Sequence, residues 1–304
     1  MTKLNFTYQG PSKQRLDSWL GRQVPDKSRA ALQELVKAGQ VYVNDVRAKK
    51  PSQSLQSGDV VAIDFPPPPK LEPDETIELE IVAEEPTFLV VNKPSGLVVH
   101  PGSGNPDKTL TNGLIARYPE IVDVGEDPLR PGIVHRLDKD TSGVMVIARS
   151  QGEYENLKKQ FQERETEKTY LAVLDGEVDS SRGTIEGKMR RSEAVPVKRE
   201  LVSEGEGKDS RTDYEVIDRK DDRTLVKTMP RTGRMHQLRV HFASIGHPIV
   251  GDRLYGSRKQ TDSLQLHAQK LHFRDSLGIW REYEVAPPLS FQGWDPVSGL
   301  PTGR

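Results

Sequence analysis

The sequence predicts an α+β protein in which a small N-terminal module precedes a larger domain built on a mixed, mainly antiparallel central β-sheet. The chain has 304 residues, which exceeds the length of one average domain. Four consecutive prolines, Pro66–Pro69, follow a helix-rich beginning, and beyond them short apolar strands outnumber the helices. We therefore expect a module at residues 1–65, a proline-rich acidic linker and lead-in at 66–85 and the main domain at 86–304.

Two helices are expected at the start of the N-terminal module. Leu16, Trp19 and Leu20 recur at the spacing that places apolar side chains on one face of a helix. A second helix can begin after Ser28, whose hydroxyl is a favourable N-cap. It can end at Gly39, because glycine adopts the left-handed conformation that stops a helix without strain.

A hairpin and the linker complete this part of the chain. Val41–Val43 alternates like a strand and runs into Asn44 and Asp45, a turn-forming pair. Another short strand is expected at Val60–Ile63. The four prolines that follow favour an extended polyproline II spacer, so they mark the best domain boundary in the chain.

The main domain is expected to be rich in strands. Its one clear amphipathic helix carries Tyr154, Leu157 and Phe161 on one face, and shorter helices are expected at Thr109–Arg117 and His236–Ser244. The predicted strands are 77–82, 88–91, 143–148, 170–173, 212–217 and 224–228.

Charge is distributed unevenly along the chain, although the net charge is only −1. Residues 1–65 carry ten Lys and Arg against six Asp and Glu, or +4, whereas residues 66–85 carry one against seven, or −6. The remaining residues carry 33 against 32. The total therefore conceals a basic module beside an acidic connector, and a basic module can bind an anionic polymer. A second basic run, 182–199, is more often a solvated face than a phosphate contact.

Composition excludes several classes of protein. The chain has no cysteine, which rules out disulfides, thiolate catalysis and cysteine-based zinc sites. No run of about 18 apolar residues is long enough for a membrane span, and the N-terminus lacks the charged-then-apolar layout of a signal peptide. The histidines never take the spacing of a metal motif such as H-E-x-x-H. We expect a cytoplasmic protein without membrane contact, metal or cofactor, and a monomer by default.

The segment 131–148, PGIVHRLDKDTSGVMVIA, places a run of polar residues between two apolar strands. Polar residues at a junction between strands can form a site that is held by a rigid sheet. Asp138 is the candidate carboxylate. A surface turn in which Asp138 caps Thr141 and the charges are solvated explains the same residues about equally well.

A second polar segment, 230–241, reads PRTGRMHQLRVH. Gly233 lets the backbone approach a ligand, and three planar guanidinium groups nearby can bind phosphate or carboxylate, namely those of Arg231, Arg234 and Arg239. From His236 onward the pattern is helical. An exposed basic start of a helix accounts for this segment slightly better than a binding site does.

Two further polar segments are explained by structure alone. In the first, EKTY leads a strand, and its tyrosine, Tyr170, is more often half-buried packing than a functional group. The second, LVVNKPSGLVVHPG at residues 89–102, is expected to form a strand, a Pro-Ser-Gly turn and another strand.

In their order along the chain, these four segments resemble the RluA-type family of RNA pseudouridine synthases. HRLDKDTSG resembles the catalytic motif of the family, and RTGRMHQLRVH resembles its arginine motif. EKTY and LVVNKPSGLVVHPG resemble two further family motifs, and so do two short segments near the end of the chain, GDRLYG and LHA. Separately, residues 15–63 resemble an S4 RNA-binding module through RLDSWL and VYVNDVRAKKPSQSLQSGDVV. The arrangement of an S4 module ahead of the catalytic domain resembles that of the family members that modify large-subunit ribosomal RNA, the synthase D subgroup.

The resemblance implies an isomerase that converts specific uridines of structured RNA, above all 23S ribosomal RNA, to pseudouridine. It implies that Asp138 is the essential aspartate, that Arg239 pairs with it, and that Tyr170 meets the target base or ribose. Arg136 would occupy the space that an extruded uridine leaves in the RNA stack. Met235 departs from the family pattern, because many members have a polar residue there.

The chemistry of this reaction fits the residue types. Isomerisation breaks the N-glycosidic bond, turns the uracil and joins its C5 to ribose C1′, so nothing is oxidised and no cofactor is needed. It needs a carboxylate near C1′ or C2′ and the exclusion of water. The carboxylate could attack C1′, add to the base or assist a glycal route, and we favour C1′ attack or a glycal, with the tyrosine as proton acceptor. We expect three catalytic residues, Asp138, Tyr170 and Arg239, and five that bind the substrate, His135, Arg136, Arg231, Arg234 and His236.

Other functions stay open at this point. Asp138 and Asp140 share a face of an extended segment and could be the paired carboxylates of a glycoside hydrolase, although the surrounding Lys and Arg favour an anionic polymer. The same isomerisation of transfer RNA is a second alternative, and a catalytically silent S4-type RNA-binding protein is a third.

Overall fold

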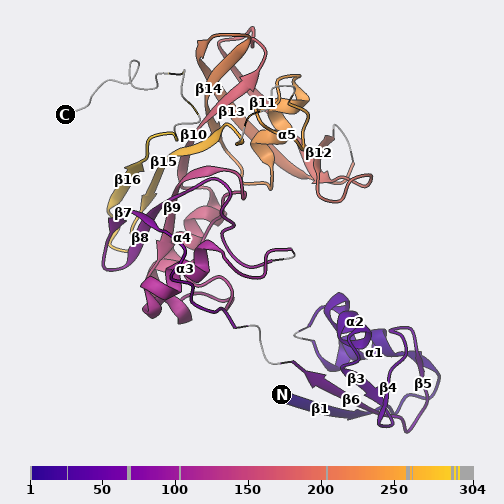
Figure 1. Ribbon diagram of the computed structural model, residues 1–304. Coiled ribbons are helices and arrows are strands. Elements are labelled where there is room, and N and C mark those ends of the chain that lie inside the picture. Colours follow the sequence, from indigo (N-terminus) through magenta and orange to yellow (C-terminus); the bar gives the residue numbers. More distant parts are fainter. Residues whose placement is uncertain are drawn as a thin grey trace. The chain divides into compact units, whose positions relative to one another are not determined.

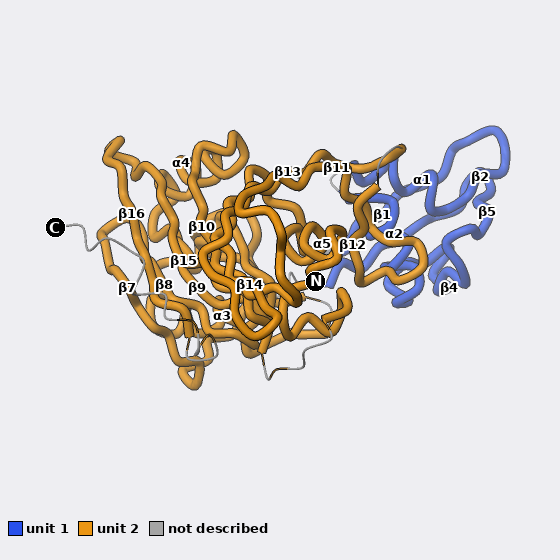
Figure 2. The backbone as a smooth tube through the Cα atoms, turned by 90° about the horizontal axis from the view of Figure 1, so that it is seen from above, with its two compact units in different colours: residues 1–69 blue, residues 70–304 orange. Residues whose placement is uncertain are grey.

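The computed structural model describes residues 2–294, with gaps at 26, 67–69, 103, 203–204, 258–260, 262, 289–290 and 292–293. The chain divides into two compact units, residues 1–69 and residues 70–304 (Figure 2). Three of the four prolines at this boundary lie outside the described residues. Each unit buries its own set of apolar side chains, which gives each a separate hydrophobic core.

The first unit packs helices α1 (Leu16–Gln23) and α2 (Arg29–Lys37) against a four-stranded sheet with the order β1–β6–β3–β4 (Figure 1). The sequence predicted both helices and the two ends of α2. Ser28 Oγ accepts a hydrogen bond from the Ala31 N–H at 3.2 Å, and Gly39 has a φ of 71° just beyond α2. The strands of this unit are β1 (Thr2–Thr7), β2 (Gln14–Arg15), β3 (Val41–Val43), β4 (Val46–Arg47), β5 (Ser54–Leu55) and β6 (Val60–Phe65).

The second unit is built on one large sheet with the order β12–β11–β13–β14–β10–β15–β9–β8–β7, and β16 pairs with β15 beside this path. Within the described residues, β9 and β15 form the one parallel pair and the other pairs are antiparallel. The predicted fold class, α+β with a mixed and mainly antiparallel sheet, is therefore confirmed. The strands are β7 (Glu80–Glu84), β8 (Phe88–Lys93), β9 (Ser142–Ala148), β10 (Glu167–Asp175), β11 (Arg182–Arg191), β12 (Arg199–Val202), β13 (Lys208–Arg219), β14 (Arg223–Pro230), β15 (Leu266–Arg274) and β16 (Trp280–Glu284).

Helices cover the two halves of this sheet separately. The helices α3 (Leu110–Arg117) and α4 (Gln151–Glu163) lie beside β8 and β9, with the short 3-10 helix η1 (Pro119–Asp123) after α3 (Figure 1). The helix α5 (Gln237–Ser244) packs on the other half, near β11 to β13. The two halves meet at the neighbouring strands β9, β15 and β10. No helix in the described part of the chain is long and apolar enough to cross a membrane.

Gly143 allows β9 to begin very close to β15. Its φ is 124°, and a Cβ atom there would lie 2.1 Å from the carbonyl oxygen of Ala268. Any other residue would be strained and would push the two strands apart. The glycine of the Thr-Ser-Gly run therefore fixes where the loop that contains Asp138 meets the sheet.

Some predicted strands were wrong or missing. Residues 97–99 form no strand, and the strand that was predicted at 77–82 lies at Glu80–Glu84. β11, β12, β15 and β16 were not predicted. In β11 only Ile185 and Met189 are buried among exposed charges and glycines, so the strand lacks the apolar alternation by which strands are recognised.

Candidate active site

Asp138 lies in the loop that precedes β9, between two hollows of the second unit. One hollow has a volume of about 870 Å³ and the other about 630 Å³. The two hollows share six lining residues and together form one cleft. The side chain of Asp138 is 20% exposed, so its carboxylate can be reached from this cleft. Both hollows are lined by Arg136, Leu137, Asp138, Met235, His236 and Arg239.

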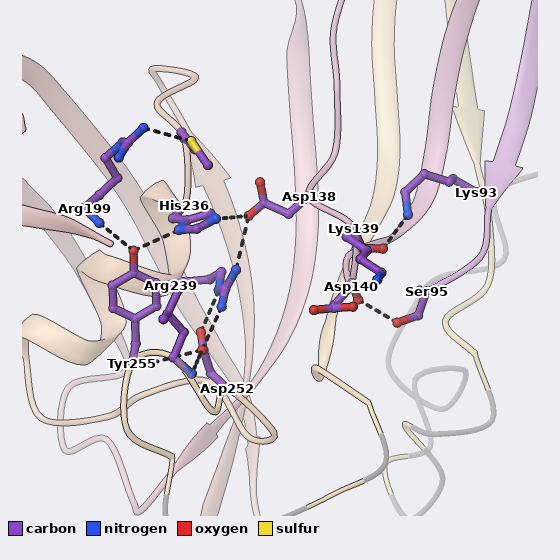
Figure 3. A network of polar contacts seen from close by, with 12 residues as sticks. Lys93, Ser95, Asp138, Lys139, Asp140, Arg199, His236, Arg239, Asp252 and Tyr255 are labelled. Carbon is purple, nitrogen blue, oxygen red and sulfur yellow. Dashed lines mark hydrogen bonds and ion pairs between the residues drawn. The ribbon is translucent and has the colours of Figure 1, made fainter. Parts of the chain in front are cut away.

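The neighbouring turn after β8 holds this loop in place (Figure 3). Lys93 is fully buried, and its Nζ donates to three carbonyl oxygens at 2.8–2.9 Å, one of them that of Lys139. Burial lowers the pKa of Lys93 to about 7, while three carbonyl acceptors use all three hydrogens of the ammonium form. Ser95 Oγ also donates to the carbonyl oxygen of Asp140 at 2.8 Å. The segment that the sequence explained as strand and turn thus positions the backbone beside Asp138.

Arg239 faces Asp138 but is held by another carboxylate. Its Nε and Nη2 donate to the two oxygens of Asp252 at 2.7 and 2.9 Å, whereas its Nη1 lies 3.7 Å from Asp138 Oδ2. Asp252 is fully buried and also accepts the backbone N–H groups of Leu254 and Tyr255. A bidentate pair fixes the plane of a guanidinium group, so Asp252 aims Arg239 at Asp138.

His236 faces Asp138 from the start of α5. Its φ is 59°, a left-handed conformation that is rare outside glycine and that recurs at functional sites. Its Nε2 lies 3.9 Å from Asp138 Oδ2, and its Nδ1 lies 2.9 Å from the hydroxyl oxygen of Tyr255 (Figure 3). Burial is the main cause that lowers the pKa of His236, so the ring is neutral at pH 7.

Tyr170 lines the smaller hollow together with Asp138 and Lys168. Burial, and then the charge of Asp138, raise the pKa of its phenol well above the usual value. The hydroxyl is therefore protonated at neutral pH. Burial likewise lowers the pKa of Lys168. An aromatic hydroxyl, a carboxylate and an arginine from three distant segments thus surround one cleft.

This cleft occurs in a chain that matches two family models. The model of the RNA pseudouridylate synthases matches residues 87–244, and the S4 domain model matches residues 14–61. The chain belongs to the RNA pseudouridine synthases. The synthase match covers the cleft residues from the turn after β8 to α5 and ends before Asp252, which also lines the larger hollow, and the S4 match precedes it.

Relatives across the full length agree with this assignment. The synthase is 42% identical to an RNA pseudouridine synthase of Aquifex aeolicus, over 95% of both chains. It is 38% identical to the ribosomal large subunit pseudouridine synthase D of Yersinia pestis, over 90% of this chain and 88% of that one. Among solved structures, human RNA pseudouridylate synthase domain containing 1 superposes with a TM-score of 0.60 at 31% identity, covering 72% of this chain and 87% of that one.

Two more predicted residues lie in the cleft of the synthase. Arg136 is exposed there, and its Nη1 lies 3.3 Å from Nε2 of His100. His135 lines the smaller hollow, but its Nε2 accepts the backbone N–H of Val146 at 3.1 Å and its ring stacks on Phe161. Burial lowers the pKa of His135 to about 3, which suits this acceptor role. His135 therefore has a clear structural contact besides its place in the cleft.

The remaining two arginines differ in position. Arg234 lines the smaller hollow, and its Nε donates to the carbonyl oxygen of Asp209 at 3.1 Å. Arg231 lines neither hollow around Asp138 and donates instead to Asp213 at 2.7 Å. The structure thus gathers seven of the eight predicted site residues around one cleft, and Arg231 is the exception.

Sequence reasoning assigned no role to Asp252, Tyr255 or Lys93. The first two belong to the segment GDRLYG, more than 100 residues from Asp138, and nothing in its local pattern indicates that it reaches the cleft. A single buried acid after a turn reads as a capping residue. Among the residues that the structure describes, no three His, Asp or Glu side chains gather as a group that could hold a metal ion.

Proposed function

We propose that this synthase isomerises uridines of large-subunit ribosomal RNA and that Asp138 is its catalytic carboxylate. The observation that carries the proposal is the place of Asp138 between the two hollows, with Arg239 and His236 on one side and Tyr170 in the same smaller hollow. The guanidinium of Arg239, 3.7 Å away, can direct the carboxylate toward a substrate, as nucleophilic or base catalysis requires.

The other cleft residues have roles that follow from their chemistry. An exposed guanidinium such as Arg136 can stack in the place of a uridine that has left the RNA helix, while the extruded base enters the cleft. Tyr170 can lie against the base or ribose. The phenol of Tyr170 is protonated at neutral pH. In a glycal route, Tyr170 can take the C2′ proton only if it passes its own hydroxyl hydrogen to another group. Asp138 is a carboxylate in the same hollow that can accept this hydrogen. Arg234 and His236 face the same RNA strand, and Arg231 would contact phosphate outside the cleft.

The reaction itself can be followed through the hydrogen on C5 of uridine. With RNA that carries tritium at C5, we expect one tritium released to water for each uridine isomerised, because C5 gives up its hydrogen when it bonds to C1′. Free uracil in place of released tritium would instead indicate a hydrolase. Binding without either product would indicate a catalytically silent RNA-binding protein.

The choice of ribosomal RNA rests on the name of the Yersinia pestis relative and on the S4 domain. We expect large-subunit ribosomal RNA from a strain that lacks this protein to lose one or a few pseudouridines. Restoring the gene should restore them. Losses confined to transfer RNA would overturn the ribosomal target while leaving the reaction intact.

The N-terminal domain is proposed to add affinity rather than chemistry. Arg15 and Arg29 are about half exposed and both contact the buried carboxylate of Asp17, which holds the two cations on one side of α1 and α2. Cations that contact phosphate release counterions, so they make binding dependent on salt.

Removing residues 1–69 should therefore weaken binding to structured RNA and flatten its dependence on salt concentration. The second unit has its own core and should stay folded. Filter binding at several salt concentrations measures the slope, which falls by roughly 0.9 for each phosphate that the protein no longer neutralises. A full-length Arg15→Gln, Arg29→Gln variant is the matched control and should reproduce part of the change; an unchanged slope in both would refute this role.

We place the RNA-binding module at residues 1–65, the proline-rich acidic linker and lead-in at 66–85 and the catalytic domain at 86–304, with β7 of the lead-in paired to β8 of the catalytic domain. The enzyme would act as a cytoplasmic monomer. It would need no cofactor, because the isomerisation involves no net oxidation and transfers no group to another molecule.

A further inference from the structure

Tyr255 is connected to Asp138 through a chain of polar contacts, and the proposed mechanism gives Tyr255 no role. Its hydroxyl oxygen accepts the backbone N–H of Arg199 at 2.8 Å, and the same oxygen lies 2.9 Å from Nδ1 of His236 (Figure 3). The opposite ring nitrogen of His236, Nε2, faces Asp138 Oδ2 at 3.9 Å. A line of contacts therefore runs from β12 through Tyr255 and His236 to the carboxylate.

The direction of the hydrogen bond between Tyr255 and His236 follows from the acceptors on offer. The amide of Arg199 can only donate, so the Tyr255 oxygen accepts there. Within the described residues, Nδ1 of His236 is the one acceptor that lies within hydrogen-bond distance of the phenol oxygen. Burial raises the pKa of Tyr255, which keeps its hydrogen in place. The phenol thus donates to Nδ1, and Nδ1 carries no hydrogen.

We infer that Tyr255 is a positioning residue that holds His236 in the tautomer with hydrogen on Nε2, so that the ring presents an N–H to the Asp138 carboxylate. The inference rests on the proposed role of Asp138. In the opposite tautomer, the lone pair of Nε2 would face the carboxylate and the phenol hydrogen would have no acceptor. Both consequences are unfavourable in a partly buried site.

The surroundings of Tyr255 keep its ring in one place. The guanidinium of Arg239 lies 5.1 Å from the ring centroid and Nζ of Lys198 lies 5.9 Å from it. The His236 ring meets it edge to face, with a centroid separation of 5.7 Å. The backbone N–H of Tyr255 is held by the same Asp252 that aims Arg239. Arg239 and His236 are thus oriented toward Asp138 from one common support.

Tyr255→Phe tests the inference, because it removes the hydroxyl and leaves the ring beneath Arg239. Two-bond ¹H–¹⁵N correlation spectra of labelled full-length enzyme distinguish the two imidazole tautomers, and the His236 signals are assigned by their loss in His236→Gln. We expect hydrogen on Nε2 in the natural enzyme and a shift toward the other tautomer in Tyr255→Phe. Tyr214→Phe, which removes the hydroxyl of a buried tyrosine that packs on Phe242 in the same unit, should leave the spectrum unchanged.

Turnover provides a second readout. We expect Tyr255→Phe to lower kcat about tenfold with KM within about twofold, the size that the loss of one hydrogen bond in a catalytic arrangement gives. In a His236→Gln background the same change should cost nothing more, because both residues act through one contact. A natural enzyme with hydrogen on Nδ1, or an equal loss of kcat in the His236→Gln background, would overturn the inference. Failure of the proposed catalytic role would be seen separately, as activity in Asp138→Asn, and would leave the tautomer spectrum as it is.

Discussion

Asp138→Asn should abolish pseudouridine formation, with kcat lowered by about four orders of magnitude or more, as happens when an enzyme loses the group that forms or breaks bonds. The amide has the same shape as the carboxylate but neither its charge nor its nucleophilicity. Asp138 contacts Arg239 and His236 only at 3.7 and 3.9 Å, so the fold does not depend on its charge. Tritium release measures the loss of activity, and filter binding should give an RNA affinity within about twofold of the natural enzyme.

Asp140→Asn is the matched control for this experiment. Asp140 lies two residues further along the same loop, is exposed, and is held through its backbone carbonyl by Ser95. Its replacement should therefore leave kcat within about threefold. Equal losses in the two variants would favour a pair of carboxylates, as in a glycoside hydrolase, over a single catalytic aspartate. Retained turnover in Asp138→Asn would refute the assignment outright.

Asp252→Asn should destabilise the second unit by about 3–5 kcal/mol, because it breaks a buried ion pair and leaves the charge of Arg239 without its bidentate acceptor. The side chain of Asp252 is fully buried and that of Arg239 is 10% exposed. Activity should fall as well, since Arg239 would no longer be held toward Asp138. The free energy of unfolding can be measured in urea by tryptophan fluorescence. A Trp19→Phe background leaves Trp280 and Trp294, which both belong to the second unit, as reporters.

Glu215→Gln provides the comparison of like chemistry at the surface. Glu215 accepts from Arg182 at 2.7 Å, and the arginine side chain is 77% exposed. Breaking such a pair typically changes stability by less than about 1 kcal/mol. If Asp252→Asn were as mild as Glu215→Gln, the pair with Arg239 would not be the support that we describe.

Much of the local structure follows from the sequence by simple rules. Ser28 and Gly39 mark both ends of α2, and the continuous apolar runs at 88–91 and 143–148 locate two central, buried strands. These predictions succeed because caps and apolar periodicity act over a few residues. β11 and β12 escaped prediction for the complementary reason: they are half exposed, and their pairing with each other and with β13 decides their conformation.

The sequence by itself determined that an aspartate in a polar loop, a strand tyrosine and an arginine-rich helix start belong to one RNA-modifying family, because motif order survives in a linear pattern. Only the tertiary structure decided how these groups are aimed. Asp252 holds Arg239, Tyr255 contacts His236, and Lys93 fixes the loop that contains Asp138. These contacts join residues that are 13, 19 and 46 positions apart in the chain. A buried polar group finds such partners only when the chain folds around it.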